Sequence, residues 1–240
     1  MTPPLCSILE WDSAFFGCPV ARLNERHVNA KSLAEVFEWC TAHRVRCLYY
    51  LAPAEDVPSL LAAQAAGMQF IDVRMTLTRD LEPEQTWVVA ATISPATAAD
   101  RSALLALAPH LARVSRFSAD PHFGTEAALR LYEAWLTKQA HAVLVARMLE
   151  DPERIGGAVM CNIALDGAGV IDLLAVTLES RGQGLALDLC HAALHWFADR
   201  RCSQVRVVTQ GHNVASQRAY QRAGFVTQSV EIWFHKWFDG

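Results

Sequence analysis

A glycine-rich turn stands between an apolar stretch and a helical pattern in the last third of the chain. Its sequence is Arg181-Gly182-Gln183-Gly184-Leu185-Ala186, after the apolar stretch 170–178 and before the helical pattern 185–200. In a strand, turn and helix of this kind, consecutive backbone N–H groups and the positive end of the helix dipole point at one small volume. The spacing matches neither a nucleotide triphosphate loop nor the G-x-G-x-x-G dinucleotide pattern. We expect the turn to bind an anion.

A second polar motif, 213–224, follows the apolar stretch 204–210 and has the pattern of a short helix. Asn213 is a good helix N-cap, and Gly224 is a good helix stop. Ser216 and Tyr220 lie between them on the expected helix. A tyrosine has an ordinary pKa of about 10, so it stays protonated at neutral pH and can protonate a leaving group. The alternative is that Tyr220 is only a half-buried aromatic of that helix.

Two carboxylates and two histidines border these motifs. Asp172 and Glu179 lie in or just after the stretch 170–178, and either could take a proton from a substrate ammonium through water. An exposed surface carboxylate looks the same in a sequence, so the general base is left open. His191 and His195 stand four apart on an expected helix, yet no Glu follows His191 and no third ligand is apparent. We therefore predict no metal site.

The composition is that of an ordinary globular protein, with 240 residues, 52% hydrophobic residues and a formal charge of −4. Seven cysteines without a C-x-x-C pair match neither a zinc site nor a disulfide framework, so we expect reduced thiols. No apolar run approaches the ~20 residues of a membrane span, and residues 1–10 lack the features of a signal peptide. We expect a cytoplasmic protein that binds a small molecule, without a membrane or nucleic-acid partner. Whether it forms a homodimer is left open.

Hydrophobic periodicity predicts two series of helices and strands, separated by a charged, proline-containing linker at 79–84. The first series is expected to form a domain over 1–82, and the second a domain over 86–240. We expect an α+β, or mixed α/β, fold around one mostly antiparallel sheet. The expected elements are, in order, the strand 20–23, helix 31–43, strand 47–51, helix 57–66, strands 70–77 and 87–93, helices 97–111 and 125–140, strands 143–149, 158–165 and 170–178, helix 185–200, strand 204–210, helix 214–223 and strands within 226–238.

The two series repeat one pattern. An offset of 157 residues (196 − 39 = 157) aligns Trp39 with Trp196 and Gly67 with Gly224 without a gap. The order helix, strand, helix, Ala-Gly, strand is thereby repeated, which indicates a duplication. At this offset the glycine turn falls on residues 24–29, which contain no glycine. We expect the first copy to lack the anion site.

Together the two motifs resemble the acetyl-CoA site of the GNAT superfamily of N-acetyltransferases. The resemblance rests on Arg181-x-x-Gly184-x-Ala186 and on Asn213-x-x-Ser216-x-x-Ala219-Tyr220-x-x-x-Gly224-Phe225. It implies a GNAT fold, a mostly antiparallel twisted sheet flanked by helices, preceded by a smaller, degenerate GNAT-like domain. The chain departs from the superfamily at Ser216, where alanine is usual, and at Leu178-Glu179, which lacks the usual proline.

The same resemblance implies roles for the site residues. The strands 170–178 and 204–210 would splay apart around the pantetheine arm of acetyl-CoA, and the backbone of Leu174, Ala175 and Val176 would hydrogen-bond that arm. The N–H groups of 182–186 would bind the pyrophosphate, with Arg181, Asn213 and Ser216 as further coenzyme contacts. Tyr220 would lie near the thioester sulfur. Its hydroxyl would then protonate the leaving thiolate.

Two shorter stretches, 11–17 and 115–120, resemble a branch of that superfamily, the dTDP-fucosamine N-acetyltransferases. These enzymes acetylate the 4-amino group of dTDP-4-amino-4,6-dideoxygalactose. Arg116 suits such a substrate because a guanidinium can pair with a diphosphate through two hydrogen bonds, although it could instead pair with Asp120 in its own loop. The likeness implies that the acceptor contacts are Phe15, Phe16, Arg116, Phe117 and Asp120.

The function that the resemblance implies is direct acetyl transfer from acetyl-CoA to the amine of a nucleotide-linked amino sugar, without an acyl-enzyme. One alternative is acetylation of another small amine, such as an amino acid, a polyamine or an antibiotic. Another is a module that binds acyl-CoA without catalysis. Tyr220 argues against that module, because a sensor needs no proton donor beside the sulfur.

Overall fold

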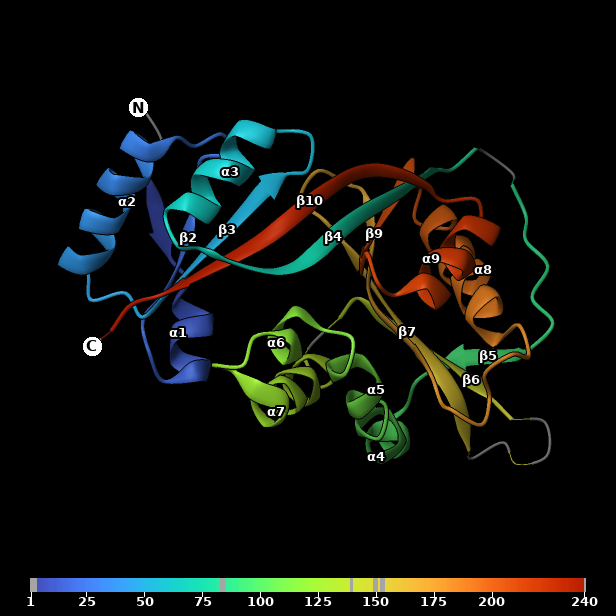
Figure 1. The fold of residues 1–240 in the computed structure, drawn as a ribbon. Helices are drawn as coiled ribbons and strands as arrows, with labels where there is room; N and C mark the ends of the chain where they lie inside the picture. Colours follow the sequence, from blue (N-terminus) through green and yellow to red (C-terminus); the bar gives the residue numbers. More distant parts are fainter. Residues whose placement is uncertain (1–3, 83–84, 139, 149–150, 152–153, 240) are drawn as a thin grey trace. The chain divides into compact units, whose positions relative to one another are not determined.

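A computed structural model describes residues 4–82, 85–138, 140–148, 151 and 154–239. The chain divides into two compact units, Met1–Arg74 with Ser229–Gly240, and Met75–Gln228 (Figure 1). Two long strands, β4 (Gln69–Asp80) and β10 (Val226–Trp237), contribute residues to both units. This division differs from the boundary expected at 82–86, because β4 continues unbroken through the first two residues of the expected linker.

The first unit contains a small sheet and three helices. β2 is parallel to β3, and β3 is antiparallel to the C-terminal part of β10. The N-terminal elements β1 and α1 escaped the sequence analysis because both are short. The elements are β1 (Cys6–Ile8), α1 (Glu10–Phe16), β2 (Val20–Leu23), α2 (Ala30–Ala42), β3 (Cys47–Pro53) and α3 (Val57–Ala65), with the adjoining parts of β4 and β10.

The second unit is built on the strand order β9-β8-β7-β6-β5. The pairs β5–β6, β6–β7 and β7–β8 are antiparallel, and β8–β9 is parallel, so the expected mixed α/β fold with a mostly antiparallel sheet is confirmed. The elements are β5 (Thr92–Pro95), η1 (Ala98–Asp100), α4 (Arg101–Leu105), α5 (Ala108–Ala112), α6 (Arg116–Ala119), α7 (Gly124–Leu136), β6 (Ala142–Arg147), β7 (Ile155–Ile163), β8 (Gly169–Val176), α8 (Leu185–Ala198), β9 (Gln204–Gln210) and α9 (Val214–Arg222).

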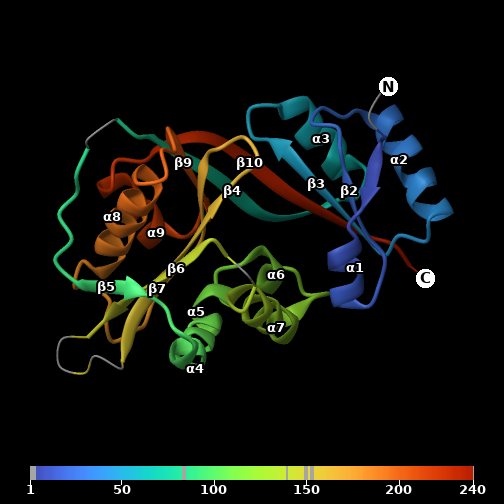
Figure 2. The ribbon, with the colours of Figure 1, turned by 180° about the vertical axis from the view of Figure 1, so that it is seen from behind.

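Helices cover both faces of this second sheet. Figures 1 and 2 show α8 and α9 on one face and the group α4–α7 on the other. The core on the α8 side is built from side chains such as Leu189, Leu194 and Phe197, all fully buried, which pack against β6–β9. No helix in the described ranges is long and apolar enough to cross a membrane.

The strand expected at 87–93 is wrong for most of its length, since the strand β5 covers only Thr92–Pro95. The preceding residues instead lie along α8. The backbone N–H groups of residues 90 and 91 donate to the carboxylate of Asp188, and the imidazoles of His191 and His195 bond to the carbonyls of residues 88 and 87. These three side chains stand at i, i+3 and i+7, on one side of the helix. The two histidines are thus structural.

The single helix expected at 97–111 is also wrong, because the segment is broken into η1, α4 and α5. Asp100 is turned inward, where both of its oxygens accept hydrogen bonds of 3.0 Å from Arg147 on β6. Pro109 stands in the first turn of α5, since a proline has no N–H for the interior of a longer helix. The helix expected at 125–140 ends at Leu136, and β10 is one strand where several were expected.

The repeat seen in the sequence extends to the structural elements. Adding 157 to the bounds of β3 (47–53), α3 (57–65) and β4 (69–80) gives 204–210, 214–222 and 226–237, which are the bounds of β9, α9 and β10. Gly67 and Gly224, which follow α3 and α9, both have a left-handed backbone, with φ of 73° and 81°. Each unit also has a parallel strand pair, β2–β3 in the first and β8–β9 in the second. These coincidences support the duplication.

Candidate active site

The parallel strands β8 and β9 separate toward their carboxyl ends. They pair only from Gly169↔Val205 to Ile171↔Val207, although β8 continues to Val176 and β9 to Gln210. On its other side, the segment 174–176 is paired with β7. The edge of this segment that faces β9 therefore lacks strand pairing, and its backbone groups are available to a ligand. Ligands commonly bind beyond the carboxyl ends of parallel strands.

A β-bulge marks the place where the strands separate. Leu173 pairs with Met160, and Ile171 pairs with Cys161, so Asp172 is an extra residue in β8. It directly follows the last residue that pairs with β9. A bulge re-aims side chains, and here Asp172 and Leu173 line the same hollow although they are adjacent in the strand.

That hollow has a volume of about 270 Å³, close to the lower end of ligand pockets at about 300 Å³. The carboxylate of Asp172 accepts a short hydrogen bond from the Nδ2 of Asn162. The hollow also contains a cation, Lys138, which forms no ion pair with Asp172 in the described structure. Its lining residues come from α7 and the segment after it, β7 and β8: Trp135, Lys138, Met160, Asn162, Asp172 and Leu173.

The glycine turn leads from β8 into α8. Gly182 and Gly184 have φ of 77° and 81°, and a Cβ at either position would have no protein atom within 4 Å. The carbonyl of Gly184 accepts the hydrogen bonds that begin α8. The five backbone N–H groups of 182–186 donate to no residue that the structure describes. These N–H groups at a helix N-terminus have the arrangement expected of an anion site.

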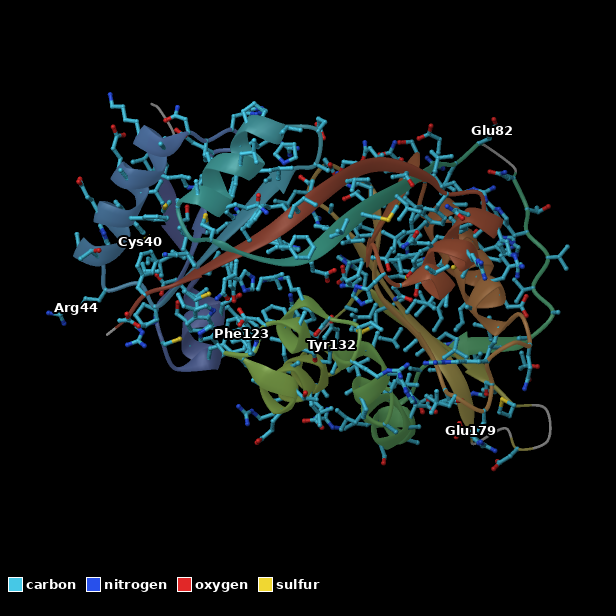
Figure 3. The ribbon with its side chains drawn as sticks, viewed as in Figure 1. Cys40, Arg44, Glu82, Phe123, Tyr132 and Glu179 are labelled. Carbon is cyan, nitrogen blue, oxygen red and sulfur yellow. The ribbon has the colours of Figure 1, made fainter. Side chains whose placement is uncertain are left out.

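Charged side chains surround this turn. Burial lowers the pKa of His110, and the neighbouring Arg181 lowers it further. Hydrogen bonds from its own backbone N–H and from Thr177 lower the pKa of Glu179, which remains exposed at the outer edge of the second unit (Figure 3). A lowered pKa makes a carboxylate a weaker base, and Glu179 does not line the hollow. Of the two carboxylates considered as bases, Asp172 is the one in the hollow.

The helix α9 begins as the sequence predicted. Asn213 caps it, its Oδ1 accepting from the backbone N–H of Ser216 at 3.3 Å. Gln217 supports the preceding loop, because its Nε2 donates to the carbonyls of residues 210 and 211. The cap uses the Oδ1 of Asn213 and the backbone of Ser216. The Nδ2 of Asn213 donates to no described residue, so it is available to a ligand.

Tyr220 lies on α9 and is only 4% exposed. Burial raises the pKa of its hydroxyl well above the ordinary value, and the neighbouring Cys190 adds to the shift. Its ring packs against Phe225 with centroids 5.8 Å apart. No hydrogen bond joins its hydroxyl to a residue in the described part of the chain. The hydroxyl is thus protonated at neutral pH and has no acceptor among the described residues.

The expected acceptor contacts are not among the described residues that line the hollow. Phe117 is 3% exposed and packs against Phe123 and Trp135, while the guanidinium of Arg116 lies over its ring at 4.1 Å. Asp120 is fully buried and accepts from the backbone N–H and the Nδ1 of His122. Phe117 and Asp120 therefore belong to the buried interior around α6 and α7.

The other two expected contacts, Phe15 and Phe16, lie on α1 in the first unit. Phe15 stacks on Trp11 with centroids 5.1 Å apart and meets Phe16 edge-on. Of the residues that line the hollow, Asp172 was a candidate in the sequence. Trp135 has the spacing of a core residue, and Asn162 was missed because it lies in an apolar strand pattern.

The segment of the first unit that corresponds to the glycine turn differs from it. At the offset of 157, Asp56 and Ser59 stand for Asn213 and Ser216, and Ala63 stands for Tyr220. This segment is bonded to its own unit. His27 contacts the Asp56 carboxylate at 2.7 Å, and the backbone N–H of residue 28 donates to Ser59 Oγ at 2.8 Å. The N–H of residue 28 is thus already bonded, and the loss of the anion site in the first copy stays a prediction.

Comparisons with known proteins agree with this geometry. Residues 110–225 match the sequence model of the acetyltransferase (GNAT) family. A spore coat polysaccharide biosynthesis protein, SpsD, from Bacillus subtilis is 28% identical over 149 residues, which is 60% of this chain and 50% of that protein. The chain thus spans about half the length of this relative.

Solved structures share the fold. A GCN5-related N-acetyltransferase from Sphaerobacter thermophilus superposes with a TM-score of 0.68 at 15% identity, over 97% of this chain and 76% of that one. A tandem GNAT protein from the clavulanic acid biosynthesis pathway superposes with a TM-score of 0.58 at 16% identity, over 92% of this chain and 76% of that one. The chain therefore has the GNAT fold, and its residues 110–225 match a family of acetyltransferases that use acetyl-CoA as the acetyl donor.

Proposed function

We propose that this protein transfers an acetyl group from acetyl-CoA directly to the amine of a small acceptor. One observation carries the proposal. The opening between β8 and β9 begins at the same bulge at which Asp172 and Leu173 line the hollow. A thioester in the opening would then present its carbonyl to an amine in the hollow, so no acyl-enzyme is needed.

The coenzyme would occupy the opening and the glycine turn. The five N–H groups of 182–186 suit the pyrophosphate, and the edge of Leu174, Ala175 and Val176 that faces β9 suits the amide groups of pantetheine. Arg181 and the amide of Asn213 are further donors near this path. The same backbone edge offers N–H donors to the oxygen of the tetrahedral intermediate, where such donors stabilise developing charge.

Asp172 would bind the acceptor ammonium and take its proton. An amine attacks a carbonyl only in its neutral form, so a base is needed beside it. The ammonium would give one proton to Asp172, which releases it to solvent, the neutral nitrogen would bond to the thioester carbon, and the carbon–sulfur bond would break. Tyr220, whose buried hydroxyl stays protonated at neutral pH, would donate its proton to the departing thiolate. The second proton of the nitrogen would then restore the hydroxyl of Tyr220 through solvent.

The acceptor that we propose is a nucleotide-linked amino sugar, such as dTDP-4-amino-4,6-dideoxygalactose. The similarity to a spore coat polysaccharide biosynthesis protein supports a sugar. The hollow supports it as well, because Trp135 offers an aromatic side chain beside polar groups. We further propose that the first unit is a degenerate GNAT-like domain, which the repeated elements and the similarity to a tandem GNAT protein support.

Thiol release from acetyl-CoA tests the proposed reaction. The purified protein is assayed with the sugar nucleotide, simple amino sugars, polyamines and amino acids. We expect turnover with at least one amine, and a fall in kcat of about 10²-fold for both Tyr220→Phe and Asp172→Asn, as for loss of an acid or a base. Tyr132→Phe, another buried tyrosine in the second unit, is the control. Tight acetyl-CoA binding without turnover of any amine would leave only a binding module.

A further inference from the structure

We propose that Asn162 and His141 are positioning residues that fix which oxygen of the Asp172 carboxylate faces the acceptor. This inference rests on the proposed function, in which Asp172 receives the proton of the amine. The three side chains form a chain of hydrogen bonds at the hollow. Asn162 donates to Asp172 from Nδ2, and its Oδ1 accepts from both the backbone N–H and the Nδ1 of His141, at 2.9 Å and 2.8 Å.

The orientation of the Asn162 amide follows from its neighbours. The backbone N–H of His141 can only donate, so the oxygen of the amide must face it. Turning the amide over would place its NH₂ group against that N–H and its oxygen against the Asp172 carboxylate, and both contacts would be repulsive. Nδ1 of His141 is consequently the protonated nitrogen. A protonated Nδ1 has no lone pair to accept with, so the approach of the Ile163 N–H to this nitrogen, at 3.2 Å, is a contact and not a hydrogen bond.

The sheet register brings these residues together. His141 directly precedes β6, Asn162 lies near the end of β7, and Asp172 lies on β8. The neighbouring residue Cys161 pairs with Ala142 on one side and Ile171 on the other, so the three polar residues occupy adjacent strands at one level of the sheet. Asp172 is the extra residue of the bulge and lacks a strand partner of its own. The hydrogen bond from Asn162 therefore holds Asp172 where a regular strand residue would be held by its strand partner.

The direction of the chain has a chemical consequence. Each hydrogen bond runs toward Asp172, so the chain of donors ends at one oxygen of its carboxylate. Oδ2 is occupied by Asn162, which leaves Oδ1 for the ammonium of the acceptor. The other charged or titratable groups around Asp172 are Lys138, which lines the same hollow, and Cys161. Burial, and then the nearby Asp172, raises the pKa of the Cys161 thiol to about 12, so this thiol stays neutral.

The test is the separate measurement of kcat and KM for the acceptor in Asn162→Ala and His141→Ala. We expect Asn162→Ala to lower kcat about tenfold and to leave KM nearly unchanged, because the carboxylate still attracts the ammonium but is no longer held in one orientation. His141→Ala should cause a smaller change in the same direction, since its backbone N–H still orients Asn162. The affinity for acetyl-CoA should stay unchanged in both.

Two controls separate positioning from folding. Met160→Leu alters the same hollow without a polar group, and Asp166→Asn removes a carboxylate that pairs with Arg206 on the hairpin. Met160→Leu should change KM rather than kcat, and Asp166→Asn should leave both constants unchanged. An unchanged kcat in Asn162→Ala, with Asp172→Asn still impaired, would overturn this inference and leave the proposed reaction standing. Full activity of Asp172→Asn would instead refute the role of Asp172 itself.

Discussion

The glycine turn offers a sharp test, because the chain contains a second glycine in the same conformation. Gly184 has φ of 81° and Gly167, in the hairpin between β7 and β8, has φ of 83°. A Cβ at either position would have no protein atom within 4 Å. Alanine should therefore destabilise both positions only through the left-handed backbone, by about 1–2 kcal/mol. The two variants are matched in stability and differ only in the coenzyme site.

The expected effect on coenzyme binding differs between them. In Gly184→Ala, the backbone is pushed toward negative φ, and the N–H groups of the turn no longer converge on the pyrophosphate. Hydrogen bonds to a charged group contribute about 1.5–3 kcal/mol each. Loss of one such bond would weaken acetyl-CoA binding by about 10–100-fold, since 1.4 kcal/mol is a factor of ten. Gly167→Ala should bind acetyl-CoA like the unaltered protein.

Two measurements check this expectation. Urea unfolding gives the free energy of unfolding of each variant, and titration calorimetry with acetyl-CoA gives its Kd. If both variants lose similar stability and only Gly184→Ala has a higher Kd for acetyl-CoA, the pyrophosphate assignment is supported. Equal Kd values in the two variants would refute it, because the turn would then be only a connection between β8 and α8.

Two other groups give independent predictions. Hydrogen bonds, first from Arg147, lower the pKa of the buried Asp100 to about 2, so the ion pair's contribution to stability is complete above about pH 4 and is lost as the pH falls toward 2. Asp100→Asn should lower the free energy of unfolding by about 2 kcal/mol at neutral pH and remove this acid dependence. Urea titrations from pH 7 to pH 2 would measure both effects. A free energy of unfolding that still falls between pH 4 and pH 2 as in the unaltered protein would contradict this. Lys138 lines the hollow without pairing to Asp172, so Lys138→Gln should raise KM about tenfold for acceptors that carry a phosphate and leave KM unchanged for the matched phosphate-free amines. An equal rise for both kinds of acceptor would mean that Lys138 does not recognise the anion.

The coenzyme side of the site could be predicted because its signals are local. A helix cap, a helix stop and a glycine turn depend on residues within a few positions of one another, and Asn213, Gly224 and Gly184 took the expected conformations. The expected separation of β8 from β9 is also present. Backbone conformation at such positions is decided largely by the residue itself.

The acceptor side could not be predicted in the same way. The hollow joins Trp135 on α7, Asn162 on β7 and Asp172 on a bulge in β8, and these residues meet only through the register of the sheet. In the sequence, Trp135 has the pattern of a core residue, and Asp172 resembles any exposed carboxylate. The short motifs at 115–120 instead led to Phe117 and Asp120, both of which are buried.

The sequence by itself determined the order of most helices and strands, the repeat at an offset of 157, and the turn where coenzyme binding is expected. Those features arise from hydrophobic periodicity and from residues that favour particular backbone angles. Only the tertiary structure decided that residues 87–91 lie along α8, that Asp100 interrupts a helix, and that Asp172 is braced by Asn162. In each case a side chain or backbone group is satisfied by a partner distant in the sequence. Such partners are decided by packing and strand register, which local patterns do not encode.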